Sequence, residues 1–332
     1  MKYYIAVDVG ASKTRVALCT ESAILDKHVA STPREGDEYT IAELIASIAK
    51  SKWSSYLGEV AAVGVGTIGP IDIKQGRVVN TPNLPIRTFH LLEPLVEEFK
   101  KPVYVVNDAV AAAWGEKHYG VARGYENVVY VTLSTGIGVG VVVDGHLLIG
   151  KAGNAHEAGH IVVDFNSDMP CGCGGRGHWE SFAGGANLPR VARKLLESTG
   201  LQTELAKAIL SGSEVTAKTI FDYYRRGDEL AKKVVELYIK ATAAGVASII
   251  NTYDPEIVVL GGGVFLNNMD ILLEPIVNLV KENAVTPLPE FKPTALGDDV
   301  GLYGALAIAV NTPLALKKVQ DPAISRILLK ST

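Results

Sequence analysis

The stretch YYIAVDVGASKTRVALC, residues 3–19, places two apolar runs on either side of a short polar turn. Tyr3 to Val9 and Arg15 to Cys19 have the length and composition of β-strands, and Gly10 permits a tight connection between them. The stretch therefore predicts a two-stranded hairpin with glycine at its tip.

The same design returns in the middle of the chain. Val128 to Leu133 and Val139 to Val143 flank a turn that contains Gly136 and Gly138. Two such hairpins indicate two related halves. Helical patterns lie between and after the strands, at residues 41–50, 92–100, 109–119, 229–251 and 301–310. Because strands alternate with helices, we expect an α/β fold.

Length and charge limit the possible functions. A chain of 332 residues exceeds one typical core, which favours two domains with a ligand between them. We expect a first lobe over residues 1–108, completed by residues 301–332, and a second lobe over residues 109–300. The chain has 32 basic and 36 acidic residues, a formal net charge of −4. This balance gives no electrostatic reason to expect nucleic acid or a membrane as a partner.

The apolar runs and the cysteines indicate the compartment. The longest run, Val128 to Val143, is interrupted by polar residues and glycines and falls short of the ~20 residues that a membrane helix needs. Asp8 comes too early for the apolar segment of a signal peptide. Three cysteines cannot all pair with one another. We therefore expect a cytoplasmic protein.

Two glycine motifs for nucleotides can be set aside. The chain contains no G-x-x-x-x-G-K-[ST] sequence, which excludes a P-loop. A G-x-G-x-x-G occurs at Gly64, Gly66 and Gly69, after the apolar run Val60 to Val63. Pro70 follows it directly, so the motif does not open the helix that a dinucleotide site requires.

The two hairpin turns and a triple glycine are better candidates for a nucleotide site. Glycine lets the backbone approach a phosphate, and Asp8 can hold Mg²⁺ through water. Glycine is also ordinary in hairpins, so either turn alone is equally consistent with a structural role. Together with the three glycines after the strand Ile257 to Leu260, they outline a nucleotide site. The predicted residues are Asp8, Gly10, Ser12, Lys13, Thr14, Ser134, Thr135, Gly136, Gly138, Gly261, Gly262 and Gly263.

Asp108 lies between the apolar run Val103 to Val106 and a helical pattern. Two interpretations are open, a helix N-cap and a catalytic base. Asn107, Glu157 and Glu180 add the amide and carboxylates that pockets for polyhydroxylated ligands use. These neighbours favour the catalytic interpretation, although both roles are compatible.

A cluster of metal ligands follows. His160, Cys171, Cys173 and His178 lie within eighteen positions of one another, and four such groups match a closed, tetrahedral zinc site. We expect a structural Zn²⁺ there. We also expect His160 to bind this metal through one ring nitrogen, so that its other nitrogen, or Glu157, meets a ligand.

These blocks resemble the ROK family of sugar kinases, which share a two-lobed, actin-like and ribonuclease-H-like ATPase fold with an active-site cleft between the lobes. The resemblance runs from Asp8 to about Gly304. It is carried, in order, by the turn from Asp8 to Lys13; Asn107 and Asp108; the turn from Thr132 to Gly140 with Gly150 and Gly153; the block from Glu157 to Glu180; and Gly261 to Gly263.

The resemblance implies phosphorylation of a hexose, commonly glucose at its 6-hydroxyl, with ATP and Mg²⁺, and with Asp108 as the catalytic base. It implies a sugar site made of Gly66, Asn83, Asn107, Asp108, Glu157, His160 and Glu180. It also implies a homo-oligomer, a dimer or larger. The family's zinc site uses one His and three Cys, and this chain has His178 in place of the third Cys. The chain also departs from the family by having Ala11 and Ser12 where Gly and Thr are usual.

Other functions stay open at this stage. The acceptor can be another hexose, such as mannose, fructose or an N-acetylhexosamine, or several hexoses. A sugar-sensing ROK regulator would share the sugar-binding residues but needs a helix-turn-helix domain ahead of them. An actin-like ATPase would share the nucleotide turns without needing Glu157, His160 and Glu180.

Overall fold

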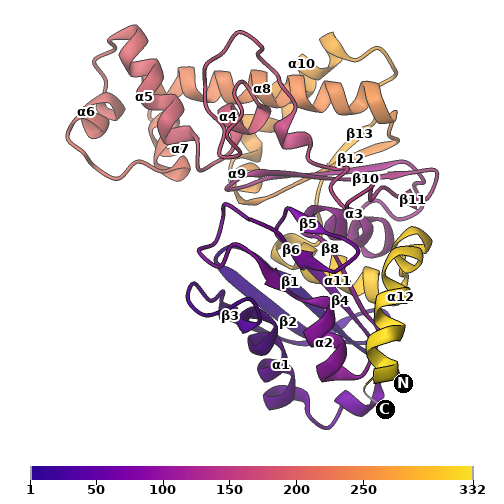
Figure 1. Cartoon of the computed structure of the whole chain (residues 1–332). Helices are drawn as coiled ribbons and strands as arrows, with labels where there is room; N and C mark the ends of the chain where they lie inside the picture. Colours follow the sequence, from indigo (N-terminus) through magenta and orange to yellow (C-terminus); the bar gives the residue numbers. More distant parts are fainter. Residues whose placement is uncertain (1, 331–332) are drawn as a thin grey trace. The chain divides into compact units, whose positions relative to one another are not determined.

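The computed structural model describes residues 2–330 (Figure 1). Met1 and residues 331–332 lie outside the described residues. They belong to the two predicted first-lobe segments, 1–108 and 301–332. The contacts divide the chain into two compact units. The first contains the residues up to Tyr130, Gly140–His156 and the residues from Thr294; the second contains Val131–Val139 and Glu157–Pro293.

The first unit contains most of the strands. Its elements, with the hairpin that continues into the second unit, are β1 (Tyr3–Val9), β2 (Lys13–Cys19), β3 (Ile24–Ser31), α1 (Thr40–Trp53), η1 (Leu57–Glu59), β4 (Val60–Thr67), β5 (Ile71–Asp72), β6 (Arg77–Val78), β7 (Phe89–His90), α2 (Leu92–Phe99), β8 (Val103–Asn107), α3 (Asp108–Tyr119), β9 (Val128–Leu133), β10 (Ile137–Val143), β11 (His146–Leu147), η3 (Gly297–Asp299), α11 (Val300–Val310) and α12 (Leu314–Lys330).

The predicted first hairpin is confirmed. β1 and β2 pair antiparallel, and the register sets Asp8 opposite Arg15. The five-stranded sheet has the order β3-β2-β1-β4-β8, in which β1 pairs parallel with β4 and β4 parallel with β8. Strand β8, which leads to Asp108, is therefore an edge strand. A small antiparallel sheet, β5-β6-β7, follows the glycine motif, and no helix opens there.

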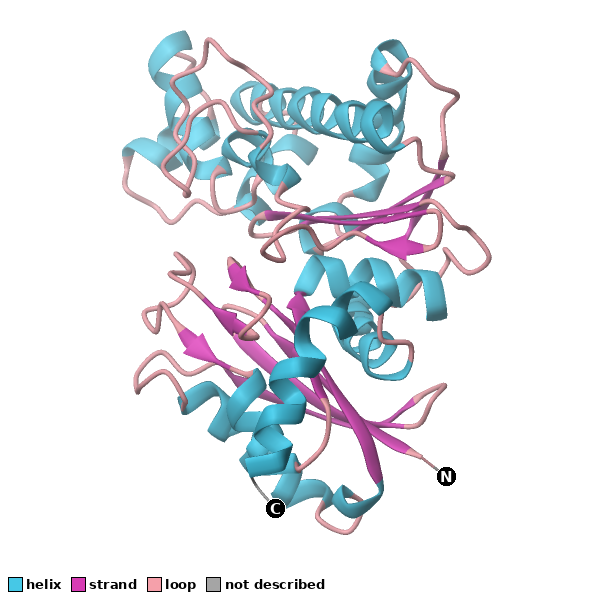
Figure 2. Ribbon diagram, turned by 45° about the vertical axis from the view of Figure 1, so that its right-hand side comes forward, coloured by secondary structure: helices cyan, strands magenta, loops and turns pink. Residues whose placement is uncertain are grey.

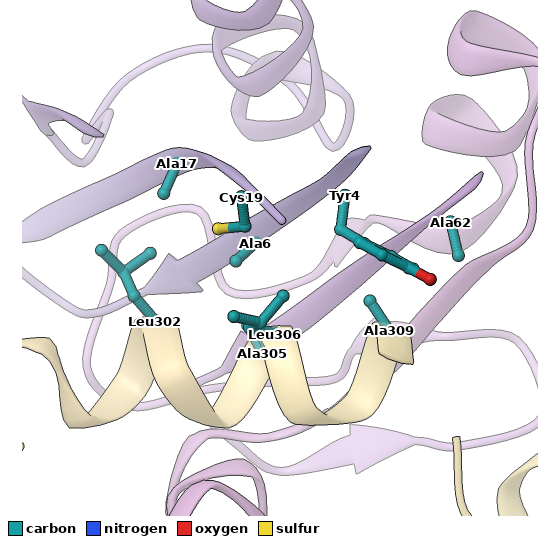
Figure 3. Close-up of a cluster of buried hydrophobic side chains, with 9 residues drawn as sticks. All are labelled: Tyr4, Ala6, Ala17, Cys19, Ala62, Leu302, Ala305, Leu306 and Ala309. Atoms are coloured by element: carbon teal, nitrogen blue, oxygen red, sulfur yellow. The ribbon is translucent and has the colours of Figure 1, made fainter. Parts of the chain in front are cut away.

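Helix α11 packs on the first sheet, as its apolar sequence predicts (Figure 3). Leu302 and Leu306 of this helix contact Ala6 of β1 and its neighbours in β2 and β4. Small residues bring the helix close to the strand, because a Cβ added to Gly64 of β4 would lie 1.9 Å from the carbonyl oxygen of Ala305. The core beneath the Asp8 turn is thus built from residues far apart in sequence.

Helix α3 belongs to the same unit. A Cβ added to Gly115 of α3 would lie 2.7 Å from the backbone nitrogen of Gly304 in α11, so the two helices cross at their glycines. The expected boundary between residues 108 and 109 places α3 in the second lobe, whereas the contacts group it with the first unit. The lobes as functional bodies stay a prediction.

The second unit is mainly helical (Figure 2). Its elements are η2 (Ala158–His160), α4 (Trp179–Ala183), α5 (Leu188–Thr199), α6 (Glu204–Leu210), α7 (Ala217–Arg225), α8 (Glu229–Tyr253), β12 (Ile257–Gly261), α9 (Gly263–Leu266), α10 (Met269–Asn283) and β13 (Glu290–Pro293). The second five-stranded sheet has the order β11-β10-β9-β12-β13.

Among the residues described, α8 alone is long and apolar enough to span a membrane as a single helix. Its most apolar window is 61% buried by α4, α5, α7 and α10, as expected for a core helix. The segments 297–310 and 314–330 pass the same test only as a pair, and they are bent by 73°.

Candidate active site and metal centre

The first helical residue after β8 is Asp108, and the residue that caps the helix is Asn107. The side-chain oxygen of Asn107 accepts the backbone N–H of Ala109 at 2.9 Å and that of Val110 at 3.4 Å. The interpretation of Asp108 as the N-cap is therefore wrong. Asp108 is partly exposed at the start of α3, and its Oδ1 accepts the N–H of Ala109 at 2.8 Å.

Gly66 lies directly against this helix start. A Cβ at Gly66 would be 3.5 Å from the Cα of Asp108 and 3.2 Å from the Cβ of Ala111. The G-x-G-x-x-G motif thus lets β4 pass close to α3. Asn83, the other predicted sugar residue of this region, is exposed, and its N–H donates to Oγ1 of Thr81 at 3.4 Å.

Asp8 lies at the end of β1 in an ion pair with Arg15. Its Oδ2 is 2.7 Å from Nη1 of Arg15, and Asp8 is only 8% exposed. Burial raises the pKa of Asp8 above its ordinary value of 3.8, and the guanidinium of Arg15 opposes that shift. Sequence reasoning missed Arg15, although the hairpin register that places it opposite Asp8 is a signal that could have found it.

The tip of the first hairpin exposes Ser12 and Lys13 and buries Thr14. The N–H of Gly10 donates to the carbonyl of Lys13 at 2.9 Å. The hydroxyl of Thr14 is fully buried and bonds that of Thr32 at 2.9 Å, and Thr32 in turn donates to the carbonyl of Gly10 at 2.7 Å. Thr14 is therefore not placed as a phosphate donor, because its side chain points into the unit and supports the turn.

In the second unit, the predicted nucleotide turns come together. The N–H of Ser134 donates to the carbonyl of Gly136 at 3.0 Å and closes the β9–β10 turn. Gly262, with φ at +88°, packs so close to Leu133 that a Cβ there would lie 2.5 Å from the Leu133 oxygen. The N–H of Gly185 donates to the carbonyl of Ser134 at 2.8 Å, a contact that the sequence analysis missed.

Glu180 joins this turn to the metal ligands. Its Oε2 accepts the N–H of Ile137 at 2.9 Å, and its Oε1 lies 3.8 Å from Sγ of Cys171. A Cβ at Gly136 would be 2.7 Å from the same Oε2, so glycine makes room for the carboxylate. Glu180 is thereby held at a defined position between the turn and the Cys/His cluster.

The four predicted metal ligands converge. The ligand atoms of His160, Cys171, Cys173 and His178 all lie within 4.8 Å of one another. Nδ1 of His160 is 3.5 Å from Sγ of Cys171, and Nδ1 of His178 is 3.3 Å from Sγ of Cys173. Backbone bonds close the loop, since the N–H of Cys171 donates to the carbonyl of Gly175 at 2.9 Å.

This cluster fits a tetrahedral zinc ion. Zinc–ligand bonds of about 2.0–2.3 Å place the four ligand atoms roughly 3.5 Å apart, which a small inward shift of these side chains achieves. The Cys₂His₂ donor set is one that structural zinc sites use. Burial raises the pKa of the Cys171 thiol to about 11, so the buried cysteine needs a cationic partner to become a thiolate.

The two ring nitrogens of His160 face different partners. Nδ1 faces Cys171, whereas Nε2 lies 3.7 Å from Oε2 of Glu157. Glu157 is exposed and precedes the short helix η2. The i, i+3 spacing of Glu157 and His160 brings the two side chains together.

The predicted sugar residues fall into two groups. Gly66, Asn83, Asn107 and Asp108 belong to the first unit, and Glu157, His160 and Glu180 to the second. A surface groove of about 600 Å³ along α8 and α10 contains none of them, and it is lined by aliphatic and charged side chains.

Comparison with known proteins gives the family. The profile of the ROK family matches residues 4–312. A glucokinase from Pyrobaculum calidifontis is 41% identical to this chain over 97% of the chain and 100% of its own length.

Two solved structures of ROK family proteins are similar to this chain. The ROK hexokinase from Thermus thermophilus has a TM-score of 0.79 and 33% identity, covering 92% of this chain and 97% of its own. The ROK family glucokinase from Streptomyces griseus, solved with glucose and AMPPNP, has a TM-score of 0.75 and 31% identity, covering 93% of this chain and 99% of its own. The expected fold class, the two-lobed actin-like ATPase fold, is confirmed. The chain is a member of the ROK family.

Proposed function

We propose that this protein is an ATP-dependent sugar kinase that converts glucose to glucose 6-phosphate. The observation that carries the proposal is Asp108 at the first position of α3, where Asn107 already supplies the cap. The named activity of the glucokinase relative, aligned over nearly the whole chain, supports glucose as the acceptor.

In the proposed reaction, Asp108 takes the proton of the sugar 6-hydroxyl as that oxygen attacks the γ-phosphorus of ATP. The new bond joins the sugar oxygen to phosphorus, and the bond from phosphorus to the β,γ-bridging oxygen breaks to release ADP. General-base catalysis is worth roughly 10² to 10⁴-fold, or about 3–5 kcal/mol of barrier.

The nucleotide site is proposed to use backbone more than side chains. The exposed tip at Ser12 and Lys13 and the turn at Ser134 to Gly136 offer N–H groups and hydroxyls to phosphate oxygens. Asp8, fixed by Arg15, would hold Mg²⁺ through water. The ion would neutralise charge on the phosphates during transfer.

The zinc ion is proposed to act structurally. Bound to Nδ1 of His160 and to Cys171, it would fix the loop and leave Nε2 of His160 and the carboxylate of Glu157 for sugar hydroxyls. The position of Glu180 beside both the turn and Cys171 supports a role at the same sugar.

A coupled assay of ADP release, with ATP and a panel of hexoses, tests the proposal. We expect release that depends on sugar, with the highest kcat/KM for glucose among mannose, fructose and N-acetylglucosamine. ATP hydrolysis that is indifferent to every sugar would favour an actin-like ATPase, and sugar binding without turnover would favour a regulator. Cytoplasmic location and homo-oligomeric assembly stay predictions, and light scattering tests the second.

A further inference from the structure

Helix α12 lies beyond the residues that the family profile matches. The match ends at residue 312, and α12 runs over Leu314–Lys330. The helix nevertheless packs against the first unit (Figure 1). Its Leu316 and Ile324 are buried.

Gln320 of α12 is fully buried and forms three hydrogen bonds with backbone groups. Its Oε1 accepts the N–H of Val105 at 3.0 Å, and its Nε2 donates to the carbonyl of Val105 at 2.8 Å and to that of Ile73 at 2.8 Å. Both N–H bonds of the amide are thereby used. A buried amide so completely paired is a specific contact rather than general packing.

The position of Val105 explains why this contact matters. Strand β8 is at the edge of the sheet, and its other side pairs with β4, where Val105 lies opposite Val65. An edge strand presents unpaired N–H and C=O groups. Gln320 pairs those of Val105 and so takes the place of a further strand.

Val105 is two residues before Asn107 and three before Asp108. No loop separates them, since β8 ends at Asn107 and α3 begins at Asp108. A second side-chain bond joins the same helix and strand, from the hydroxyl of Tyr104 to Oδ1 of Asp321 at 2.8 Å. That bond holds a side chain, whereas Gln320 holds the backbone itself.

We infer that α12 clamps the edge strand that carries Asn107 and Asp108, and that Gln320 is a positioning residue for phosphoryl transfer. The inference rests on the proposed role of Asp108. Without the clamp, β8 keeps one hydrogen-bonded neighbour instead of two, and the carboxylate at its end loses its fixed orientation. A small displacement of a catalytic base lowers kcat more than it weakens substrate binding.

The experiment compares Gln320→Met with Tyr104→Phe in the full chain. Gln320→Met preserves volume and removes all three backbone bonds, whereas Tyr104→Phe removes only the side-chain bond between the same two elements. The melting temperatures of both variants are measured first, and the kinetics are recorded at a temperature well below them. Amide exchange across residues 103–108 reports the strand directly.

We expect Gln320→Met to lower kcat about tenfold or more, with each KM within about threefold of the wild type, and to speed exchange in β8. Tyr104→Phe should keep kcat within about twofold. A normal kcat for Gln320→Met with faster exchange would overturn the positioning role, as would equal losses in both variants. A wild-type enzyme without sugar kinase activity would instead refute the proposed function itself. If Gln320→Met does not fold, Gln320→Glu takes its place, since it keeps the acceptor for the Val105 N–H but loses the two amide donors. For this variant, a normal kcat with faster exchange in β8 would overturn the positioning role.

Discussion

The side-chain oxygen of Asn107 accepts the backbone N–H of Ala109 at 2.9 Å, and this bond makes Asn107 the cap of helix α3. Asp108 follows as the first helical residue. Two adjacent polar residues thus divide two tasks, since one ends the strand and starts the helix while the other presents a carboxylate.

Asn107→Ser keeps a side chain that can cap helix α3 and removes the amide that is proposed to contact the sugar. Serine caps helices about as well as asparagine, so we expect a melting temperature close to that of the wild type. The lost amide donor should raise the KM for glucose roughly tenfold, as expected when one partner of a sugar hydroxyl is missing. A melting temperature that falls while the KM stays normal would show that Asn107 serves the helix alone.

Gly301 of α11 makes room for Asp8. A Cβ there would lie 2.6 Å from Cγ of Asp8, so Gly301→Ala must displace either the carboxylate or the helix. Overpacking of this kind costs about 1–3 kcal/mol. We expect the KM for Mg·ATP to rise roughly tenfold, because Asp8 and Arg15 shift together. Gly58→Ala, at a glycine with open space around it, is the matched control and should leave kinetics unchanged.

His178 tests the metal site. We expect His178→Ala to lower zinc content well below about one ion per chain, since three ligands no longer close the tetrahedron. His178→Cys should retain zinc and resist a chelator for longer, because it restores a thiolate. Elemental analysis measures both. Zinc retained by His178→Ala, or sugar affinity unaffected by zinc removal, would contradict the assignment.

Glu116 gives a pH dependence of stability. It is fully buried, its Oε1 accepts the hydroxyl of Thr294, and its Oε2 accepts the N–H of Val121 at 3.0 Å. Burial raises the pKa of Glu116 above its ordinary value of 4.5. A carboxyl whose folded-state pKa is raised contributes stability below its unfolded pKa, and this contribution is lost as pH rises through the folded-state value.

Glu116→Gln removes that titration and keeps a similar shape. We therefore expect the variant to gain melting temperature relative to the wild type as pH rises from about 4 to 8, with the smallest difference at the acidic end. Thermal melts across this range measure the effect. If the melting-temperature difference between Glu116→Gln and the wild type shrinks as pH rises, the raised pKa of Glu116 is contradicted.

The sequence predicted the parts of the fold that depend on local pattern. The hairpin at residues 3–19 is visible in its two apolar runs around Gly10, and the place of α11 follows from its apolar composition. The convergence of His160, Cys171, Cys173 and His178 was also predictable, because ligand type and spacing reflect the tetrahedral geometry of zinc.

What the sequence did not predict depends on boundaries and on distant contacts. A shift of one residue decides whether Asn107 or Asp108 is the cap, and both residue types suit the position. Thr14 looked like a phosphate donor because the second strand was expected to begin at Arg15. The strand begins two residues earlier, at Lys13, and Thr14 is a strand residue whose side chain is buried. The pairing of Gln320 with Val105 joins residues 215 positions apart and has no local signal.

The most direct test of the account is the turnover of Asp108→Asn. Asparagine keeps the shape of aspartate and an oxygen for the N–H of Ala109, so folding and the affinities for glucose and Mg·ATP should stay near those of the wild type. Without a base to take the proton, we predict a kcat lower by roughly 10² or more. A kcat close to that of the wild type would contradict the role of Asp108 as the catalytic base.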